Sequence, residues 1–333
     1  MPEPIEPGQL AIHDTAPIVE GSTARQSLRN SLEIAQLADE LGFARYWAAE
    51  LHGMRGVASC APAVLAGMVA STTRRIRVGA GGVLLPYHSP LLVSEQFGTL
   101  EAIHPGRIDL AVGRGAGGPR AAQLAVSADR DDSAEGFLKQ VERLRSHFRH
   151  EVTEHVRSVP GYDNEPQMWI LGSSNESARL AAALGLPYAF GGFYNRDGTE
   201  SVAETYRTEW SANVDCTPYL AAWVGVIAAE TDEEAEFLAG SFRIKSVARK
   251  LWHKKMKLPD PHTAAERRPT DKNELQQFYQ ATDGFIIGSS ARVRAELSEF
   301  KARTGADELL IRTPVYDHAS KLRSIRLLAS DAG

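Results

Sequence analysis

The sequence has few cysteines and no excess of basic charge. Its 333 residues include two cysteines, Cys60 and Cys216, which lie far apart without Cys or His neighbours at metal-ligand spacing. We therefore expect no disulfide framework and no metal site, and a reducing cytoplasm suits such a chain. The 37 basic and 42 acidic residues give a net charge of −5. That balance provides no field for binding nucleic acid or an anionic membrane surface.

Long apolar runs are also lacking. No stretch approaches about 18 uninterrupted apolar residues, and the N-terminal MPEPIEPGQL has neither the basic start nor the apolar core of a signal peptide. A cytoplasmic protein is therefore predicted. With 43% apolar and 24% charged residues the composition is that of an ordinary globular protein. The length allows two medium domains or one large α/β domain.

What is present is a regular alternation of strand-like and helix-like segments. The strand-like segments are QLAIHD, FARYWAAE, RIRVGAGGVLLP, HPGRIDLAVGRG, MWILGSS, LPYAF, PYLAAWVGVIAA, GFIIGS and DELLIRTP. Helices are expected over 25–41, 58–72, 90–103, 133–149, 175–184, 200–210, 232–242, 291–304 and 318–329, the second of them buried on nearly every side. Because strands joined by crossover helices run parallel, about eight such units predict a single (β/α)8 TIM-barrel domain over 1–333.

One segment interrupts this alternation. Residues 243–280 are polar and basic and contain a Pro-Asp-Pro break. An insertion of this length in a compact domain is typical of a lid over the site or of a poorly ordered excursion. A plain solvated helix is the third alternative.

Glycines gather at the carboxyl ends of the expected strands, where barrel enzymes build their active sites. The runs are GAGG at 79–82, GRGAGG at 113–118, LGSS at 171–174 and FGG at 190–192. Turn formation alone would explain any single run. Together the runs favour bare backbone beneath a flat ring system that lies across the barrel mouth.

The turn LGSSNES indicates a phosphate site. It contains Gly172, Ser173, Ser174 and Ser177 at the start of a helix. The free N–H groups and the positive dipole end of that helix attract a phosphate, and Arg114 at a neighbouring strand end is the expected second clamp. Ordinary N-capping, which needs one serine, is the alternative.

Over nearly its whole length the sequence resembles the bacterial luciferase-like flavin monooxygenases. The resemblance rests on RYWAAELHG, IRVGAGGVLLPYHSPLLVSEQFGTLEAIHPGRIDLAVGRG, LGSSNESARLAAALGLPYAFGG and TGADELLIRTPVYDH, which look like the branch of uncharacterised and natural-product-tailoring oxidoreductases. The resemblance implies a (β/α)8 barrel, usually a homodimer, that binds reduced FMN. A separate NAD(P)H-dependent flavin reductase supplies the FMNH2, and O2 then forms a C4a-(hydro)peroxyflavin.

The resemblance also implies cofactor-binding residues. Gly81 and Gly82 match the place where the family often has a non-prolyl cis peptide beneath the isoalloxazine ring. Arg114, Ser174 and Ser177 match phosphate-binding positions, in agreement with the argument from the helix terminus.

The segment AELHG departs from the family pattern, which commonly reads Glu-His-His. Leu51 replaces the first histidine, a catalytic acid/base in luciferases proper, and this argues against light emission from an aldehyde. His52 is retained, and Glu50 would share its strand face. We interpret His52, with Glu50 as its partner, as the catalytic proton donor or orienter; a hydrogen-bonded structural histidine is the alternative.

Large side chains near several strand ends predict a pocket for a planar substrate. The expected lining residues are Trp47, Leu51, Tyr87, His88, Phe193 and Tyr194. Ordinary core packing is the alternative for the aromatic residues.

The sequence therefore predicts a two-component, FMNH2-dependent monooxygenase that hydroxylates or epoxidises a hydrophobic or aromatic secondary metabolite. Its partners would be the reductase, the small-molecule substrate and a second copy of the chain, with no nucleic acid and no membrane. Two alternatives stay open: an F420-dependent oxidoreductase on the same type of barrel, and a non-catalytic flavin-binding protein.

Overall fold

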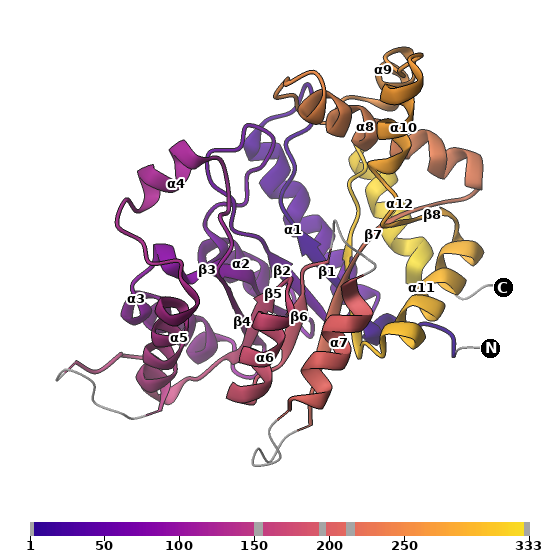
Figure 1. Ribbon diagram of the computed structural model, residues 1–333. Helices are drawn as coiled ribbons and strands as arrows, with labels where there is room; N and C mark the ends of the chain where they lie inside the picture. The colour runs from indigo at the N-terminus through magenta and orange to yellow at the C-terminus, as the bar shows by residue number, and fades with distance from the viewer. Residues whose placement is uncertain (1–2, 150–155, 193–197, 211–216, 330–333) are drawn as a thin grey trace.

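The computed structural model describes residues 3–149, 156–192, 198–210 and 217–329, and its centre is a closed barrel of eight parallel strands (Figure 1). The barrel strands, in ring order, are β1 (Leu10–Asp14), β2 (Arg45–Ala48), β3 (Arg77–Leu84), β4 (Ile108–Gly113), β5 (Gln167–Gly172), β6 (Tyr188–Phe190), β7 (Leu220–Ala229) and β9 (Glu308–Arg312). β9 pairs with both β7 and β1 and so closes the ring. The predicted (β/α)8 fold is confirmed.

A ninth strand lies outside the ring. β8 (Phe285–Ser289) pairs with the second half of β7, whereas β6 and β9 pair with its first half. β7 is ten residues long, so it continues beyond the barrel and carries β8 there. The segment GFIIGS is therefore a strand, but it is not one of the barrel strands.

Helices surround the barrel (Figure 1). They are α1 (Ala24–Glu40), α2 (Pro62–Thr72), α3 (Pro90–Ile103), α4 (Arg120–Val126), α5 (Ala134–Phe148), α6 (Asn175–Leu184), α7 (Thr199–Thr208), α8 (Asp232–Lys250), α9 (Pro261–Glu266), α10 (Lys272–Gln280), α11 (Ser290–Thr304) and α12 (His318–Ala329), with short 3-10 turns η1 (Pro7–Gln9), η2 (Leu85–Tyr87) and η3 (Gly161–Asp163). Within the described ranges no helix is long and apolar enough to cross a membrane.

Two helical predictions need correction. The apolar segment before β3 becomes helical only at Pro62, and α2 is not buried on every side, because Val64 and Met68 are 69% and 52% exposed. α4 was not predicted, since its seven residues bury no side chain and carry no helical hydrophobic period.

The segment 243–280 does not begin as an insertion. α8 continues to Lys250 because Arg243 is buried on it, where its guanidinium contacts Glu236 at 2.6 Å and Thr282 at 2.8 Å. α9 and α10 then pack on α8 around a small apolar core of their own, which includes Ile244, Val247, Ala264 and Phe278. The segment is therefore a helical cap rather than an irregular excursion, and Figure 1 shows it at one side of the upper end of the barrel, opposite α4.

A charged network fills the amino end of the barrel. Arg45 contacts Asp109 at 2.7 Å and Glu308 at 2.6 Å, and both carboxylates are fully buried. Trp47 donates its indole N–H to Asp109 at 2.9 Å, and the Arg45 guanidinium lies 4.6 Å from the centre of the Trp169 ring. Because every charge has a partner, this end is closed by structural contacts.

Candidate active site at the barrel mouth

The opposite, carboxyl end of the barrel is lined by two unlike halves. Ala11, Ala111, Trp169, Ala189, Ala221 and Leu310 form the interior cluster with Trp47. Side chains two positions farther along a strand face the same interior. This alternation puts His13, Trp223 and Arg312 on the adjacent strands β1, β7 and β9. On the other strands it puts Gly81 within β3, Gly113 at the end of β4 and Gly191 directly after β6. One half of the mouth is bulky and polar, and the other is bare.

The glycines of the bare half are present for two different reasons. A Cβ on Gly81 would lie 2.6 Å from the Trp47 ring, and one on Gly82 would lie 2.5 Å from the Ala111 carbonyl oxygen. The barrel itself requires these two glycines. By contrast, the nearest atom to an added Cβ would be 3.4 Å away at Gly191 and 3.7 Å away at Gly115. These are ordinary contact distances, so packing does not demand bare backbone at either position.

The peptide bond between Gly81 and Gly82 is cis, as the resemblance implied. His13 lies beside it, and its Nε2 is 2.7 Å from the Gly81 carbonyl oxygen. Burial first, and then the positive charge of Arg312, lower the pKa of His13 to about 4. The imidazole is therefore neutral near pH 7 and donates Nε2–H to the carbonyl, which leaves Nδ1 as an acceptor.

His13 is the main residue that the sequence analysis missed. QLAIHD was interpreted only as a barrel strand. The available signal was the spacing, because His13 lies two residues after Ala11 at the carboxyl end of that strand, where a polar side chain faces the mouth.

Glu50 connects two histidines just beyond the end of β2. Its Oε1 accepts from Nε2 of His52 at 2.8 Å and from Nε2 of His88 at 2.7 Å, and its Oε2 accepts from the Leu84 N–H at 2.8 Å. Burial alone would raise the pKa of Glu50, but the bonds from His88, Leu84 and His52 together hold it below its ordinary value. The expected contact between Glu50 and His52 is present, although β2 ends at Ala48 and the contact is made in a loop rather than on a strand face.

Tyr87 and the loop after β4 enclose His52. The Tyr87 ring meets the His52 ring edge to face at 6.0 Å, and its hydroxyl donates to the Ala116 carbonyl at 2.7 Å. Arg130 hydrogen-bonds to the same hydroxyl. The backbone N–H of His52 donates to the Gly117 carbonyl at 2.7 Å. The contacts of His52 and Tyr87 thus bring together three segments that are distant in sequence: the loop after β2, η2 and the loop after β4.

The serine turn lies at the first turn of α6, with Arg114 beside it. Ser174 and Ser177 cap the helix reciprocally, with N···Oγ distances of 3.4 and 3.3 Å. Arg114 reaches this turn through Glu176 at 2.8 Å. The structure thus brings the predicted clamp residues together, and it also contains the ordinary capping that was the alternative. Gly172 precedes the turn, and a Cβ there would collide with Ser177, while Ser173 is exposed.

The predicted substrate-pocket residues lie in different parts of the structure. Tyr87 contacts His52 and His88 donates to Glu50, as described above, and Leu51 is half-buried in the same loop as Glu50. Trp47 has no exposed surface; it lies in the middle of the barrel, below the mouth, because its indole is bonded to Asp109. Phe193 and Tyr194 lie outside the described residues.

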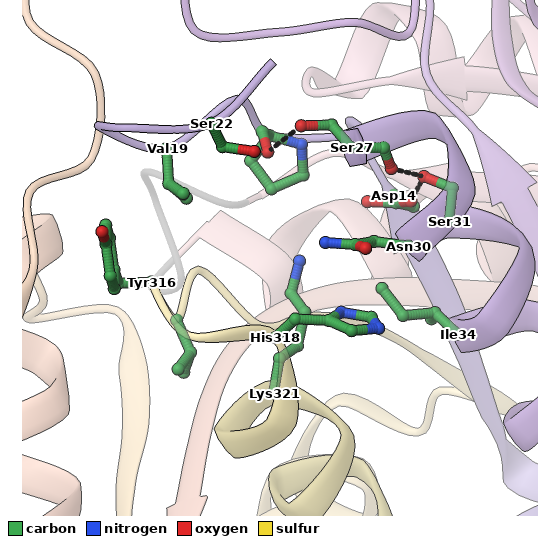
Figure 2. Close-up of a pocket in the computed structure, with 12 residues that line it drawn as sticks. Asp14, Val19, Ser22, Ser27, Asn30, Ser31, Ile34, Tyr316, His318 and Lys321 are labelled. Carbon is green, nitrogen blue, oxygen red and sulfur yellow. Dashed lines mark hydrogen bonds between the residues drawn. The ribbon is translucent and has the colours of Figure 1, made fainter. Parts of the chain in front are cut away.

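A second polar cluster lies on the outer side of β1, where Asp14 points away from the barrel interior (Figure 2). The carboxylate accepts from Ser31 of α1 at 2.5 Å and from Tyr46 at 2.8 Å, and Lys321 of α12 lies on the other side of the cavity. The cavity between them measures about 30 Å³. That volume holds roughly one water, so this cluster joins α1 and α12 to the barrel and does not form a ligand site.

Comparison with known proteins gives matches over almost the entire chain. The sequence model of one family, described as luciferase-like monooxygenase, matches residues 10–308. A protein named luciferase-like monooxygenase from Escherichia coli (strain K12) is 38% identical over 323 residues, which cover 96% of this chain and 95% of the relative. The crystal structure of apo-MsnO8 is 36% identical, with a TM-score of 0.90 over 96% of this chain and 97% of that chain. The FMN complex of the oxygenating constituent of 3,6-diketocamphane monooxygenase from Pseudomonas putida is 19% identical, with a TM-score of 0.72 over 97% of both chains, and shows the fold alone.

Proposed function

This chain belongs to the luciferase-like monooxygenase family, and on that premise we propose that it is an FMNH2-dependent monooxygenase. It would receive FMNH2 from a separate NAD(P)H-dependent flavin reductase and insert one atom of O2 into a substrate with a hydrophobic or aromatic body, by hydroxylation or epoxidation. The observation that carries the proposal is the bare half of the mouth, which lies directly beside the first turn of α6. A ring with a phosphate tail matches that pair of features.

The residues of this half fit FMN. The phosphate would lie at the first turn of α6, where Ser174, Ser177 and the backbone N–H groups can donate and Arg114 can exchange Glu176 for the phosphate. The ring would lie over the open backbone at Gly115 and Gly191. When bound, reduced FMN supplies the electrons that activate O2.

The Glu50 cluster would manage the protons of the reaction. Since Glu50 accepts from Nε2 of both His52 and His88, each neutral imidazole keeps its proton on Nε2 and offers Nδ1 as the base. A proton taken up at either Nδ1 creates an imidazolium, which the carboxylate of Glu50 stabilises. The cluster therefore holds a proton near the mouth without exposing a carboxylate to water.

We also propose that the protein acts as a homodimer, which would bury an exposed apolar face on α2 and α3. These helices pack against each other, and their outward residues include Val64 and Met68 of α2 and Leu92 and Ile103 of α3, each between 52% and 69% exposed. Several large exposed apolar side chains on two neighbouring helices support an interface on this face.

The test of the proposed function is rapid mixing of the reduced FMN complex with oxygenated buffer. We expect flavin absorbance to pass through a species distinct from both reduced and oxidised FMN, and that species to last longer than with free FMN. Reoxidation at the rate of free FMN would contradict the proposal. Tighter binding of reduced F420 than of FMNH2 would support the hydride-transfer alternative, and binding of FMN without any effect on its reoxidation would support a flavin-binding protein.

A further inference from the structure

A hollow lies where the linker between α8 and α9, residues 251–260, crosses the loop after β1. Its lining residues are Glu20, Trp252, Lys254, Lys255, Met256 and Arg267. Its volume of about 510 Å³ is within the range of about 300 to 1,000 Å³ that is typical of small-molecule sites. The cavity beside Asp14 measures only about 30 Å³. The hollow is therefore large enough for a small organic ligand.

Backbone contacts fix the two sides of this hollow. The Glu20 N–H donates to the Leu258 carbonyl at 2.8 Å, so the linker lies on the loop after β1. At the other end of the linker, His253 has a φ of 53°, in the left-handed region. This turn lets the Lys254 N–H donate back to the Ala248 carbonyl of α8 at 2.8 Å. The hollow is thus built by two segments that are distant in sequence and bonded to each other.

The cations of the hollow have donors to spare. Lys254 and Lys255 are exposed, and neither amine has a hydrogen bond or an ion pair among the residues that the structure describes. Arg267 pairs with Glu20, but the closest nitrogen and oxygen atoms are 3.8 Å apart, which is too far for a hydrogen bond. Three cations and one acid leave the lining with a surplus of two positive charges.

The hollow also lies in a basic part of an acidic protein. Residues 243–268 contain nine Lys or Arg residues and two acidic residues, although the whole chain has a net charge of −5. A concave surface with charges of one sign concentrates ligands of the opposite sign. An anion is therefore the ligand that this hollow favours.

Two apolar side chains line the hollow beside these cations. Trp252 and Met256 are partly buried and pack against the small apolar core of the helical cap. The indole N–H of Trp252 donates to Glu274 of α10 at 2.9 Å, which fixes the orientation of the ring. Because this N–H already has a partner, the indole can contribute ring contact and not a further hydrogen bond. Indole and thioether groups are good partners for a flat aromatic ring.

We propose that this hollow is a ligand site for an aromatic molecule that carries a phosphate monoester. The phosphate would lie among Lys254, Lys255 and Arg267, and the ring would lie against Trp252. A phosphate monoester has a charge of about −1.5 to −2 near pH 7, which matches the surplus of two positive charges, whereas a carboxylate supplies only one negative charge.

This site is separate from the one proposed for FMN. In the ring order β1 is opposite β5, so the hollow beside the loop after β1 lies across the barrel from the turn at α6. The inference therefore goes beyond the proposed function and adds a second ligand.

The test compares AMP with adenosine, which differ by the phosphate. Isothermal titration calorimetry measures the binding of each to the purified chain. We expect AMP to bind at least about 10-fold more tightly than adenosine. Changing Lys254→Met and Lys255→Met together should remove this preference, and Glu20→Gln should strengthen AMP binding because it removes the one acid. Lys272→Met, which alters an exposed lysine of α10 outside the hollow, is the matched control.

A second readout detects the indole directly. In protein with isotope-labelled tryptophan, AMP should shift the indole N–H resonance that is missing from the spectrum of Trp252→Phe, and should leave the other indole resonances in place. Inorganic phosphate, which has no ring, should bind more weakly than AMP to the unaltered chain and as tightly as AMP to Trp252→Ala.

Competition with FMN distinguishes two sources of the phosphate. If a second equivalent of FMN displaces AMP, the occupant is flavin outside the mouth. If FMN leaves AMP bound, the occupant is another phosphorylated aromatic molecule. Displacement of AMP by the first equivalent of FMN would overturn the proposal, because one site would then bind both compounds.

Three further results would overturn it: no AMP binding at millimolar concentration, equal affinity for AMP and adenosine, or an AMP preference that persists when both lysines are replaced. None of these measurements uses the reductase or turnover. A failure of the oxygen-mixing experiment therefore leaves this site standing, and a failure here leaves the proposed monooxygenase standing.

Discussion

His52 and His88 donate to the same oxygen of Glu50, although one follows β2 and the other follows η2 at the end of β3. Neither histidine is therefore an isolated group. The two imidazoles share one carboxylate, so a charge on either one also acts on the other. Leu51 stands where the family commonly has its first histidine, and we propose that this pair holds the proton at the mouth instead.

Glu50→Gln should lower the rate of oxygen transfer by about 10²-fold or more, because proton donors of this kind contribute roughly 10² to 10⁴ and the amide no longer stabilises an imidazolium. FMN affinity should change little, since the phosphate turn is on other strands. Single-turnover product yield and flavin titration check the two parts. Glu33→Gln, which alters a surface glutamate bonded to His318 at 2.8 Å, is the control. A Glu50→Gln protein with full turnover would show that the pair is structural.

Arg114→Ala should weaken FMNH2 binding by about 10- to 100-fold through the loss of a charge-assisted hydrogen bond. Glu176→Gln should have the opposite sign, because it removes the carboxylate that holds Arg114 at 2.8 Å and repels a phosphate. Anaerobic titration of both variants with FMNH2 measures the two changes. If both variants bind FMNH2 like the unaltered protein, the phosphate lies elsewhere.

Gly82→Ala and Gly191→Ala should fail in different ways. A Cβ at Gly82 would lie 2.5 Å from the Ala111 carbonyl, so we expect a lower melting temperature by several degrees. At Gly191 the nearest atom is 3.4 Å away, so the alanine should fold normally and weaken flavin binding instead. Thermal unfolding with and without FMN separates the outcomes. Equal flavin affinity in Gly191→Ala and the unaltered chain would show that the flavin ring does not lie at the end of β6.

His13 should make the protein less stable in acid. Its pKa is about 4 in the folded protein against an ordinary value of 6.5, so below pH 6.5 the unfolded chain takes up the proton first and stability falls with pH. The loss between pH 7 and pH 4 from this residue is about 3 kcal/mol. Urea unfolding of His13→Gln, whose amide can still donate to Gly81, should show a correspondingly shallower fall. Parallel curves for the two proteins would mean that folding does not lower the pKa of His13.

Met68→Glu should dissociate the proposed dimer, because a charge on α2 would have to be buried in the interface. Light scattering after size-exclusion chromatography gives the mass. Leu124→Glu places the same charge on an exposed apolar position of α4 and should leave the mass unchanged. A chain that is already monomeric before substitution would contradict the proposed homodimer.

The order of strands and helices could be predicted because it depends on local features. The helices over 90–103, 175–184 and 318–329 occur with the expected bounds, because a local feature marks the start of each. These features are Pro90, the Ser174 cap and the Asp317 carboxylate, which accepts from the Ser320 N–H at 2.7 Å. The end of α8 was missed because the burial of Arg243 depends on Thr282, which is far along the chain. The exclusion of β8 from the ring follows from its pairing with the second half of β7, a tertiary contact that no local pattern reveals.

The parts of the candidate site that are marked by runs of glycine and serine were predicted from the sequence. The part that depends on the single side chain of His13 was missed. The serine turn and Arg114 meet as expected. His88 was assigned to the substrate pocket, and its bond to Glu50 could not be inferred because the approach of η2 to the β2 loop is a tertiary contact. Trp47 was expected in the wall of the mouth, but sequence position alone does not distinguish one interior layer of a barrel from the next.

The pairing of β8 with β7 has a consequence for how the cap can move. The cap formed by α8, α9 and α10 leaves the end of β7 and returns to the same strand through β8, whose backbone pairs with Gly225–Ala229. Both ends of the cap are thus attached to one strand, so its three helices share an anchor on the barrel. Any movement of the cap relative to the barrel would therefore carry α8, α9 and α10 together about β7, with the pairing of β8 intact.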